Sequence, residues 1–567
     1  MKRRQFLTAG PAAIALGVLG SDVAAQSEPP ARPTVDSLKC AEPIGGVSFS
    51  GSEEELMLAN VKANREHYEA LRGMVIPVDT EPAFSVQLPT RPLPSKAAAR
   101  STPPAPRRSR SLPKRPAPDE LPFLPIASLA PLIESRTISS TELTEIYLDR
   151  LKRHDPVLQC VITLTEELAR SQASAADREI RAGRYRGPLH GVPWGVKDLF
   201  ATKGIRTTWG AKPYEHQMLD LDATVVERLR DAGAVLVAKL TSGELAIGDV
   251  WFGGKTRNPW NPELGSSGSS AGPASATSAG LVGFAIGTET NGSIISPASR
   301  CGIVGLRPTY GRVSRHGVMT LRWTLDKVGP LCRGVEDCAL VFDAIRGPDG
   351  HDQTVVDLPF TWNRSRPLGR FHIGFVEQEF DEPAADSTEE ERQRWPRRRA
   401  ALSQTLDVFR RAGAVLEPIS LPDLPARSIY AILGAEAGAA FDDLVRSGRV
   451  ADLSGKGPND RANQLRTSRF IPAVEYIQAQ RARTILFREM ERLLARCDAF
   501  LAPSDSTSVT MTNLTGHPAV TLNAGFVDGL PEAIMITGRL FDEGTLLRLA
   551  EAYEQSTDWH ARRPAVS

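Results

Sequence analysis

The stretch GSSAGPASATSAGLVGFAIGTETNGS, residues 268–293, decides how this chain is interpreted. A glycine- and serine-rich loop leads into the short apolar run Leu281 to Ile286, and a second loop follows that carries Ser293. A run of this length is typical of a buried strand or a buried helix segment, and periodicity alone does not distinguish them. Either way, two loops with small hydroxyl side chains lie at one end of a core element.

A lysine stands in an apolar stretch upstream of this segment. GPLHGVPWGVKDLFATKG, residues 187–204, places Lys197 close to Val196 and Leu199. Burial in a low dielectric disfavours the charged form of lysine and lowers its pKa by up to ~3–5 units. A neutral lysine beside serine hydroxyls can act as the base that activates a serine nucleophile. The alternatives are a surface lysine with a buried stem and loops that are only linkers or turns.

Three short motifs resemble the catalytic positions of the amidase signature family. They are Lys197 in GVKD, Ser269 in GSSAG and Ser293 in TETNGS, and the similarity extends from about Leu121 to Pro564. It also includes LDKVGPLCRGVEDCAL, residues 325–340. The resemblance implies an α/β fold with a large twisted mixed, mostly parallel sheet sandwiched by helices. It implies that Ser293 attacks an amide carbonyl, that Ser269, after a cis peptide, relays the proton to Lys197, and that no cofactor or metal takes part.

The second loop is expected to stabilise the oxyanion of the reaction. Successive backbone N–H groups of Thr290, Asn291, Gly292 and Ser293 can converge on one point, and one such donor is typically worth about 10²–10³ in rate. Relatives usually carry glycine where this chain has Asn291, and asparagine tolerates a left-handed backbone better than most residues. Ile295 stands where many relatives carry an arginine, which weakens the case for an anionic substrate group at that point.

The regions around these motifs alternate between helix and strand patterns. Ser139-x-x-Glu142 and Thr224-x-x-Glu227 read as capping boxes that open helices, and a continuous apolar strand follows at Val235 to Ala238. A buried strand after a helix is typical of a largely parallel sheet with helices on its faces. One apolar stripe of a later long helix is expected to be core: Val474, Ile477, Ile485, Leu486, Met490, Leu493 and Leu494.

The N-terminus reads as a removable export signal. Arg3 and Arg4 precede the modest apolar run Ala12 to Leu19, and Val23-Ala24-Ala25 fits cleavage before Gln26. This predicts a twin-arginine signal over residues 1–25 and a periplasmic protein. The run is shorter than the about 20 apolar residues of a membrane span, and no later segment is expected to span a membrane.

The charge balance, the cysteine count and the absence of certain motifs bear on which partners and which kinds of site the protein has. The chain of 567 residues has 68 Lys and Arg against 67 Asp and Glu, which gives no indication of a nucleic-acid partner. Six cysteines are too few for a disulfide scaffold, and whether Cys332 and Cys338 pair stays open. No His-Glu-x-x-His or Cys-x-x-Cys motif occurs, so the sequence offers no case for a metal site.

The chain divides into four parts. After the signal, residues 26–81 form an accessory segment with a helix over Glu53 to Leu71, and residues 82–120 form a basic, proline-rich linker. Between Arg91 and Arg115 there are eight basic residues, six prolines and no acid, so this stretch is expected to stay extended. It is either a linker or flap, or a weak contact to an anionic envelope surface. The amidase domain takes residues 121–567.

These observations predict an exported amidase that acts on a small-molecule amide, whose identity the sequence does not specify. Two alternatives remain. The first is the glutaminase subunit of a tRNA-dependent amidotransferase, which the family also contains and which works in the cytoplasm with a partner subunit. The second is a non-catalytic envelope-interaction protein on an amidase scaffold, against which the three intact motif residues argue.

Overall fold

The computed structural model of the chain describes residues 32–77, 80–83, 114–383 and 387–566. Its centre is a sheet of 11 strands in the order β1-β3-β2-β8-β10-β9-β14-β15-β13-β11-β12. In that order the strands are Val161–Leu164, Val235–Leu240, Pro193–Lys197, Phe284–Glu289, Lys327–Cys332, Val304–Arg307, Ala519–Val527, Leu530–Gly538, Ala499–Pro503, His372–Val376 and Val415–Ile419. Two small two-stranded sheets pair β4 (Val250–Trp251) with β5 (Gly254–Lys255), and β6 (Arg257–Asn258) with β7 (Asn261–Gly265).

The sheet is mixed. Parallel pairs form two blocks, β3-β2-β8 and β13-β11-β12. Antiparallel pairs through β10, β9, β14 and β15 connect the blocks, and β1 adds antiparallel to β3 at the edge. The expected parallel character thus holds within each block, and the antiparallel strands between them place β8 next to β10.

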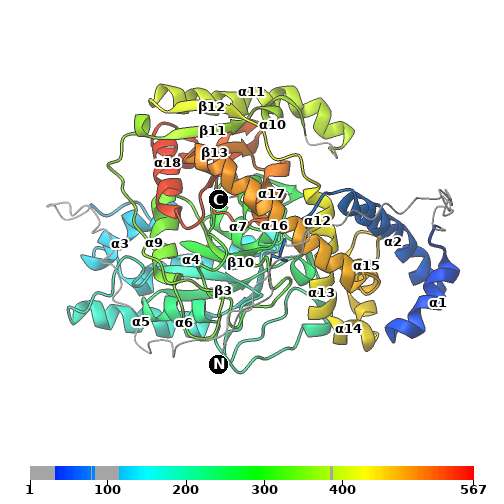
Figure 1. Cartoon of the computed structure of the whole chain (residues 1–567). Helices are drawn as coiled ribbons and strands as arrows, with labels where there is room; N and C mark the ends of the chain where they lie inside the picture. The colour runs from blue at the N-terminus through cyan, green and yellow to red at the C-terminus, as the bar shows by residue number, and fades with distance from the viewer. Residues whose placement is uncertain (1–31, 78–79, 84–113, 384–386, 567) are drawn as a thin grey trace, which may run out of the picture.

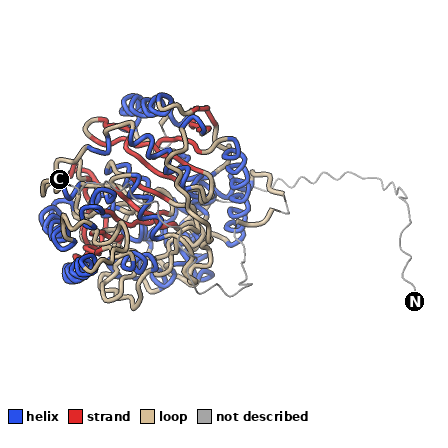
Figure 2. The backbone as a smooth tube through the Cα atoms, turned by 90° about the vertical axis from the view of Figure 1, so that its left-hand side faces the viewer, coloured by secondary structure: helices blue, strands red, loops and turns tan. Residues whose placement is uncertain are grey.

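Helices cover the sheet on both faces, which confirms the predicted α/β sandwich (Figure 2). Among those that contact strands are α4 (Ser140–Leu158), α5 (Glu166–Arg181), α7 (Ala271–Ser278), α8 (Ile295–Cys301), α9 (Val335–Ile345), α10 (Glu377–Asp381), α11 (Glu389–Arg411) and α18 (Glu543–Gln555). The other longer helices include α3 (Ile126–Glu134), α6 (Thr224–Asp231), α12 (Ala426–Ile432), α13 (Ala435–Ala440), α15 (Arg461–Ser468), α16 (Ala473–Arg496) and α17 (Thr507–Leu514).

The deciding stretch forms a helix and then a strand. Every residue of α7 and of β8 is buried, and the strand begins at Phe284, so the first residues of the apolar run form a bend. Small side chains are required in α7 because it lies against the backbone of its neighbours: a Cβ on Gly272 would lie 2.4 Å from the N atom of Thr241. This close packing fixes the two loops that carry the hydroxyl side chains, one before α7 and one after β8.

The N-terminal segment packs against the C-terminal half of the chain. Helix α2 (Gly51–Arg72) lies beside α12, α15 and α16, and α1 (Val35–Gly45) packs against α2 (Figure 1). The apolar side chains of Tyr68 and Leu71 join the same core cluster as α16, and Glu53 forms an ion pair with Arg466 of α15. The helix predicted over residues 53–71 is therefore present and extends slightly further at both ends. The predicted signal, residues 1–25, and residues 84–113 of the predicted linker lie outside the described residues.

Three local predictions were wrong, and two of them concern helix caps. Ser139 caps α4 by accepting a hydrogen bond from the N–H of Glu142, but the Glu142 side chain pairs with Arg115 instead of closing a capping box. Ala223 is the N-cap of α6, because the Thr224 hydroxyl donates to Asp349.

The third wrong prediction is the apolar stripe of α16, which is only partly core. Val474 and Ile477 are 65% and 43% exposed, because they lie on the side of the helix opposite Leu486 and Met490. Its buried face consists of Glu475, Ala479, Gln480, Ala482, Arg483, Leu486, Met490 and Leu494.

All six cysteines have free thiols, including the buried pair Cys332 and Cys338. A helix both long and apolar enough to cross a membrane does not occur in the described ranges.

We expect Met57→Ala to lower the free energy of unfolding by about 2–5 kcal/mol, because this fully buried side chain of α2 leaves a cavity. Chemical denaturation of the purified protein measures the change. Lys62→Ala, on the exposed side of the same helix, is the control and should stay within about 0.5 kcal/mol of wild type. Equal stability of both variants would mean that α2 does not unfold with the rest of the core.

Candidate active site

Lys197 lies at the end of β2 and is fully buried. Its Nζ is 2.9 Å from Oγ of Ser269, 3.2 Å from Oγ of Ser270 and 2.9 Å from Oγ1 of Thr288. The parallel pairing of β2 with β8 explains this arrangement, since it places the end of one strand beside Thr288 near the end of the other. The structure therefore brings Lys197 and Ser269 together, as the motifs predict.

Burial lowers the pKa of Lys197 well below its ordinary value of 10.5, and the more distant charges of Asp326 and Glu289 oppose this only in part. No carboxylate of the described residues lies within ion-pair distance of its Nζ. The neighbouring Lys239 differs, because its Nζ is 2.9 Å from the buried carboxylate of Asp198. Of the two lysines, Lys197 is the one whose surroundings favour the neutral amine that a base requires.

Ser269 is 1% exposed, and the Gly268–Ser269 peptide bond is cis, as the resemblance implied. Glycine is required before it, since a Cβ on Gly268 would lie 1.8 Å from the carbonyl oxygen of Gly248. One residue further on, the N–H of Ser270 donates to the carbonyl oxygen of Ser293 over 3.1 Å. This hydrogen bond joins the two serine loops directly.

Ser293 lies in the second loop, half-buried, and lines a pocket of about 480 Å³. The left-handed residue of this loop is Gly292, with φ of 83°, and Asn291 has an ordinary backbone. The expected tolerance of asparagine for positive φ is therefore not needed. Within the described ranges, the N–H groups of Asn291, Gly292 and Ser293 have no hydrogen-bond acceptor. Thr290 is held by its hydroxyl, which donates to Asp326 over 2.6 Å.

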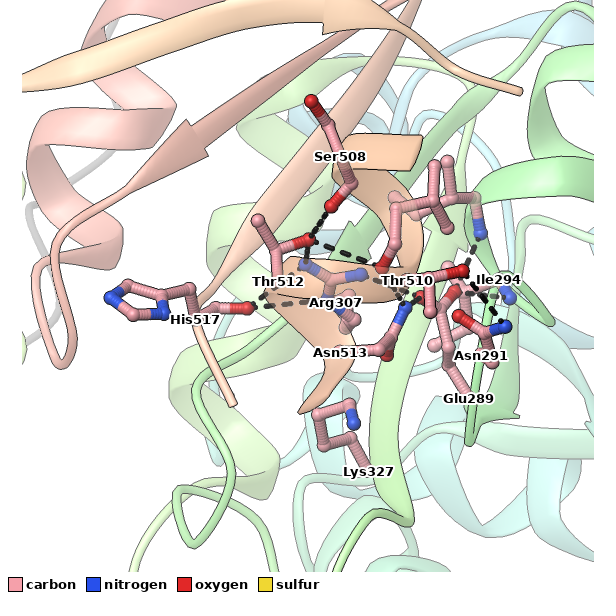
Figure 3. Close-up of polar contacts among 12 residues, drawn as sticks. Glu289, Asn291, Ile294, Arg307, Lys327, Ser508, Thr510, Thr512, Asn513 and His517 are labelled. Atoms are coloured by element: carbon pink, nitrogen blue, oxygen red, sulfur yellow. Dashed lines mark hydrogen bonds and ion pairs between the residues drawn. The ribbon is translucent and has the colours of Figure 1, made fainter. Parts of the chain in front are cut away.

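The carboxylate of Glu289, at the end of β8, holds this loop from below (Figure 3). One of its oxygens accepts the N–H groups of Ile294 and Ile295 over 2.7 and 2.9 Å. The other accepts from Arg307 and from the side-chain amide of Asn513, each over 2.8 Å. These partners lower the pKa of Glu289 despite its complete burial. Ile295 thus contributes its backbone to the loop, and its buried side chain joins the core.

Arg307 extends the network to the C-terminal part of the chain. Its guanidinium also donates to the Thr512 hydroxyl over 2.8 Å and to the carbonyl oxygen of His517 over 3.0 Å (Figure 3). Asn291 reaches the same helix, α17, through a hydrogen bond of 3.3 Å to the hydroxyl of Thr510. The loop that carries Ser293 is therefore fixed to two strands and one helix.

The pocket beside Ser293 is built from distant parts of the chain. Its walls come from α2, the loops around Gly248, Gly268 and Asn291, and the helices α12 and α15. Sequence reasoning missed most of these residues, and it missed Ser270, Thr288, Glu289 and Arg307 as well. Ser270 stands next to Ser269 in the motif, but Arg307 and the pocket residues carry no local signal. In the residues that the structure describes, no group of three or more histidine, cysteine, aspartate or glutamate side chains could hold a metal ion.

Comparisons with known proteins agree with this site. The sequence pattern of the Amidase family matches residues 142–511. A glutamyl-tRNA(Gln) amidotransferase subunit of Methylococcus capsulatus is 36% identical over 488 residues, which is 78% of this chain and 98% of the relative. The corresponding subunit of Roseiflexus is 36% identical over 75% of this chain and 95% of its own length.

Solved structures of two kinds are similar. Native peptide amidase of Stenotrophomonas maltophilia superposes with a TM-score of 0.67 at 31% identity, covering 78% of this chain and 99% of that one. The glutamyl-tRNA(Gln) amidotransferase subunit of Thermotoga maritima does so with a TM-score of 0.62 at 27% identity, covering 77% and 95%.

We expect Lys197→Met to lose orders of magnitude in amide hydrolysis, and wild-type activity to fall as the pH drops through the lowered pKa of Lys197, because only the neutral amine accepts a proton. At pH values between that lowered pKa and 10.5, Lys197 carries a proton in the unfolded chain but not in the folded protein. Over this pH range, the unfolding free energy of the wild type minus that of the variant should therefore rise with pH. Rates and denaturation curves over pH test both; an active variant, or a stability difference that declines with pH, would contradict the assignment.

Proposed function

Because the chain belongs to the amidase family, we propose that it hydrolyses a carboxamide bond through a covalent acyl-enzyme on Ser293. The observation that carries this proposal is the buried Lys197, without a carboxylate partner in the described part of the chain, at 2.9 Å from the Ser269 hydroxyl. The hydrogen bond between the two serine loops and the pocket at Ser293 support a position for the substrate carbonyl next to this pair.

The hydrogen bonds around Lys197 support a direction for the proton. A neutral amine has two N–H donors and one lone pair, which matches three contacts. The Ser270 hydroxyl donates to the carbonyl oxygen of Thr288 over 3.1 Å, so towards Lys197 it accepts. If Thr288 Oγ1 accepts the other N–H, the lone pair is left for the hydroxyl of Ser269. Ser269 is then the group that passes a proton to Lys197.

The reaction then follows in balanced steps. Ser293 Oγ attacks the carbonyl carbon while its proton moves to Ser269 and that of Ser269 to Lys197. The substrate oxygen becomes an oxyanion, which backbone N–H groups in the loop Thr290 to Ser293 stabilise. The protonated lysine returns a proton through Ser269 to the leaving nitrogen, the C–N bond breaks, and ammonia or an amine departs. Water hydrolyses the acyl-enzyme with the same groups as base and acid, and no cofactor enters these steps.

Two settings share this chemistry. The N-terminal pattern with Arg3 and Arg4 supports an exported, periplasmic hydrolase of a small-molecule amide. The names of the curated relatives favour the other setting, a glutaminase subunit of a tRNA-dependent amidotransferase that acts with a partner. Their identity of 36%, over 98% of the relative in one case, is the observation in its support.

We expect Ser293→Ala to abolish turnover of every amide that the wild type cleaves and to leave stability nearly unchanged, since it removes the nucleophile and deletes one oxygen. Assays over an amide panel and labelling with a fluorophosphonate probe measure this. Ser296→Ala, three residues further on in the first turn of α8, is the control and should retain turnover and labelling. Label on another serine, with Ser293 unmodified, would overturn the assignment.

The two settings differ in where the protein resides. For an exported enzyme, replacing Arg3 and Arg4 together by lysine should leave the unprocessed precursor in the cytoplasm, while the Lys2→Ala control is still processed. Cell fractionation and the N-terminal sequence of the mature protein measure the outcome. Unprocessed wild-type protein that copurifies from the cytoplasm with a second subunit would support the amidotransferase setting instead.

A further inference from the structure

Two buried arginines line the pocket that contains Ser293. Arg322 and Arg461 are 7% and 5% exposed, and their guanidinium groups have only uncharged hydrogen-bond partners. Arg322 donates to the carbonyl oxygen of Tyr430 over 2.7 Å and stacks over its ring, 4.0 Å from the centroid. Arg461 donates to the carbonyl oxygen of Ala246 over 3.2 Å and to Gln464 over 2.8 Å. The Nε of each arginine is buried without a hydrogen-bond partner.

Of the four other buried arginines in the described part of the chain, Arg307, Arg312 and Arg466 have carboxylate partners. The fourth, Arg483, donates to the carbonyl oxygens of Leu514 and Thr324 and does not line this pocket. Arg307 pairs with Glu289 over 2.8 Å, and Arg312 lies 3.4 Å from Glu543. In the described part of the chain, neither Arg322 nor Arg461 has such a partner. Burial, with the charge of Arg322 nearby, lowers the pKa of Arg461 to about 10, so it remains charged at neutral pH. A buried cation without a counter-charge is costly, and a ligand anion would offset that cost.

The acidic groups nearest this pocket are engaged elsewhere. Asp326 accepts the N–H groups of Leu321 and Arg322 over 2.7 and 2.9 Å, in addition to the hydroxyl of Thr290. Glu244 accepts the N–H of Ser454 over 2.8 Å. The pocket wall itself, as far as the structure describes it, contains Arg322, Arg427, Arg461 and His67 but no aspartate or glutamate.

Helix α2, from the N-terminal part of the chain, forms one wall of the pocket. Asn60, Asn64 and His67 all line it, and their spacing places them on one face of the helix. His67 lies 3.2 Å from the Ser428 hydroxyl, and burial together with the charge of Arg427 lowers its pKa. These side chains offer polar atoms opposite the arginines. They lie outside the residues that match the family pattern.

We propose that this pocket takes an amide that carries a carboxylate and lacks an ammonium group, such as a monoamide of a dicarboxylic acid. A guanidinium binds a carboxylate through two parallel hydrogen bonds, and such charge-assisted bonds are roughly twice as strong as neutral ones. The ammonium of a free amino-acid amide would meet cations and no acid. This inference rests on the proposed amide hydrolysis and deepens it by naming the substrate class.

Three substrates with one carbon skeleton test the charge preference. Glutaramate carries one carboxylate, glutaramide replaces it by a neutral amide, and glutamine adds an ammonium to glutaramate. We expect kcat/KM for glutaramate to exceed that for each of the other two by on the order of tenfold or more, the scale of a charged hydrogen bond. Succinamate and adipamate vary the distance to the anion. Equal rates on acid and neutral amides for all three chain lengths, or glutamine as the best substrate, would overturn the proposal.

Variants then test which arginines produce the preference for an amide that carries a carboxylate. Arg461→Gln should bring the ratio of kcat/KM for the preferred acid amide over its diamide towards one, and Arg461→Lys should restore part of it. Arg449→Gln, at an exposed arginine outside the pocket, should keep the wild-type ratio. Should Arg461→Gln not fold, Arg427→Gln, at an exposed position of the pocket rim, should lower the same ratio. An unchanged ratio in every folded pocket variant would contradict the proposal.

A binding measurement separates the two proposals. Calorimetry of Ser293→Ala with glutarate, succinate and adipate reports anion binding without turnover. Binding that weakens at least tenfold when Arg461→Gln is added supports the anion pocket even if the wild type cleaves no amide, in which case only the proposed function fails. Hydrolysis of neutral amides without dicarboxylate binding would refute the pocket and leave the proposed function standing.

Discussion

The carboxylate of Glu289 is the contact on which the geometry of the site depends. It is buried at the end of β8, it accepts the N–H groups of the two residues after Ser293, and it neutralises Arg307. Taking either charge away would leave the other unpaired in the interior, which typically costs about 3–5 kcal/mol. The same loop would lose the acceptor for its backbone. Fold stability and the position of the nucleophile loop therefore rest on one ion pair.

Buried cations in this protein fall into two groups. Lys239 and Arg307 have carboxylate partners and serve to hold strands and loops together. Lys197, Arg322 and Arg461 lie around the serine loops and their pocket and have none in the described part of the chain. Lys327 and Arg483 also lack one there, and their side chains donate to backbone carbonyl oxygens. The cost of a buried cation without a carboxylate partner falls when the group loses its proton or when an anionic ligand binds to it. The first solution suits a base, and the second suits a binding site.

The sequence predicts what local patterns determine. The resemblance of the three motifs to the amidase signature family implies the contact between Lys197 and Ser269, and the alternation of helices with buried strands agrees with the sandwich fold that it implies. The partners of Glu289 do not, because Arg307 and Asn513 come from separate elements that only the folded chain brings together. For the same reason the arginine pocket is invisible in the sequence. The predicted core stripe of α16 fails at Val474 and Ile477 because these two side chains lie on the side of the helix opposite Leu486 and Met490, so the predicted residues do not share one face.

The docking of α2 has a consequence for how the protein is made. This helix is complete at Arg72, but the helices that it packs against begin at Ala426. At ~5–20 residues per second, a ribosome needs roughly 20–70 s to synthesise the intervening chain. During that time the apolar side chains of Tyr68 and Leu71 lack the core cluster that buries them in the finished protein. The pocket wall is thus among the first parts to leave the ribosome and among the last to reach its place, which makes nascent α2 a natural client for a chaperone that binds exposed apolar helices.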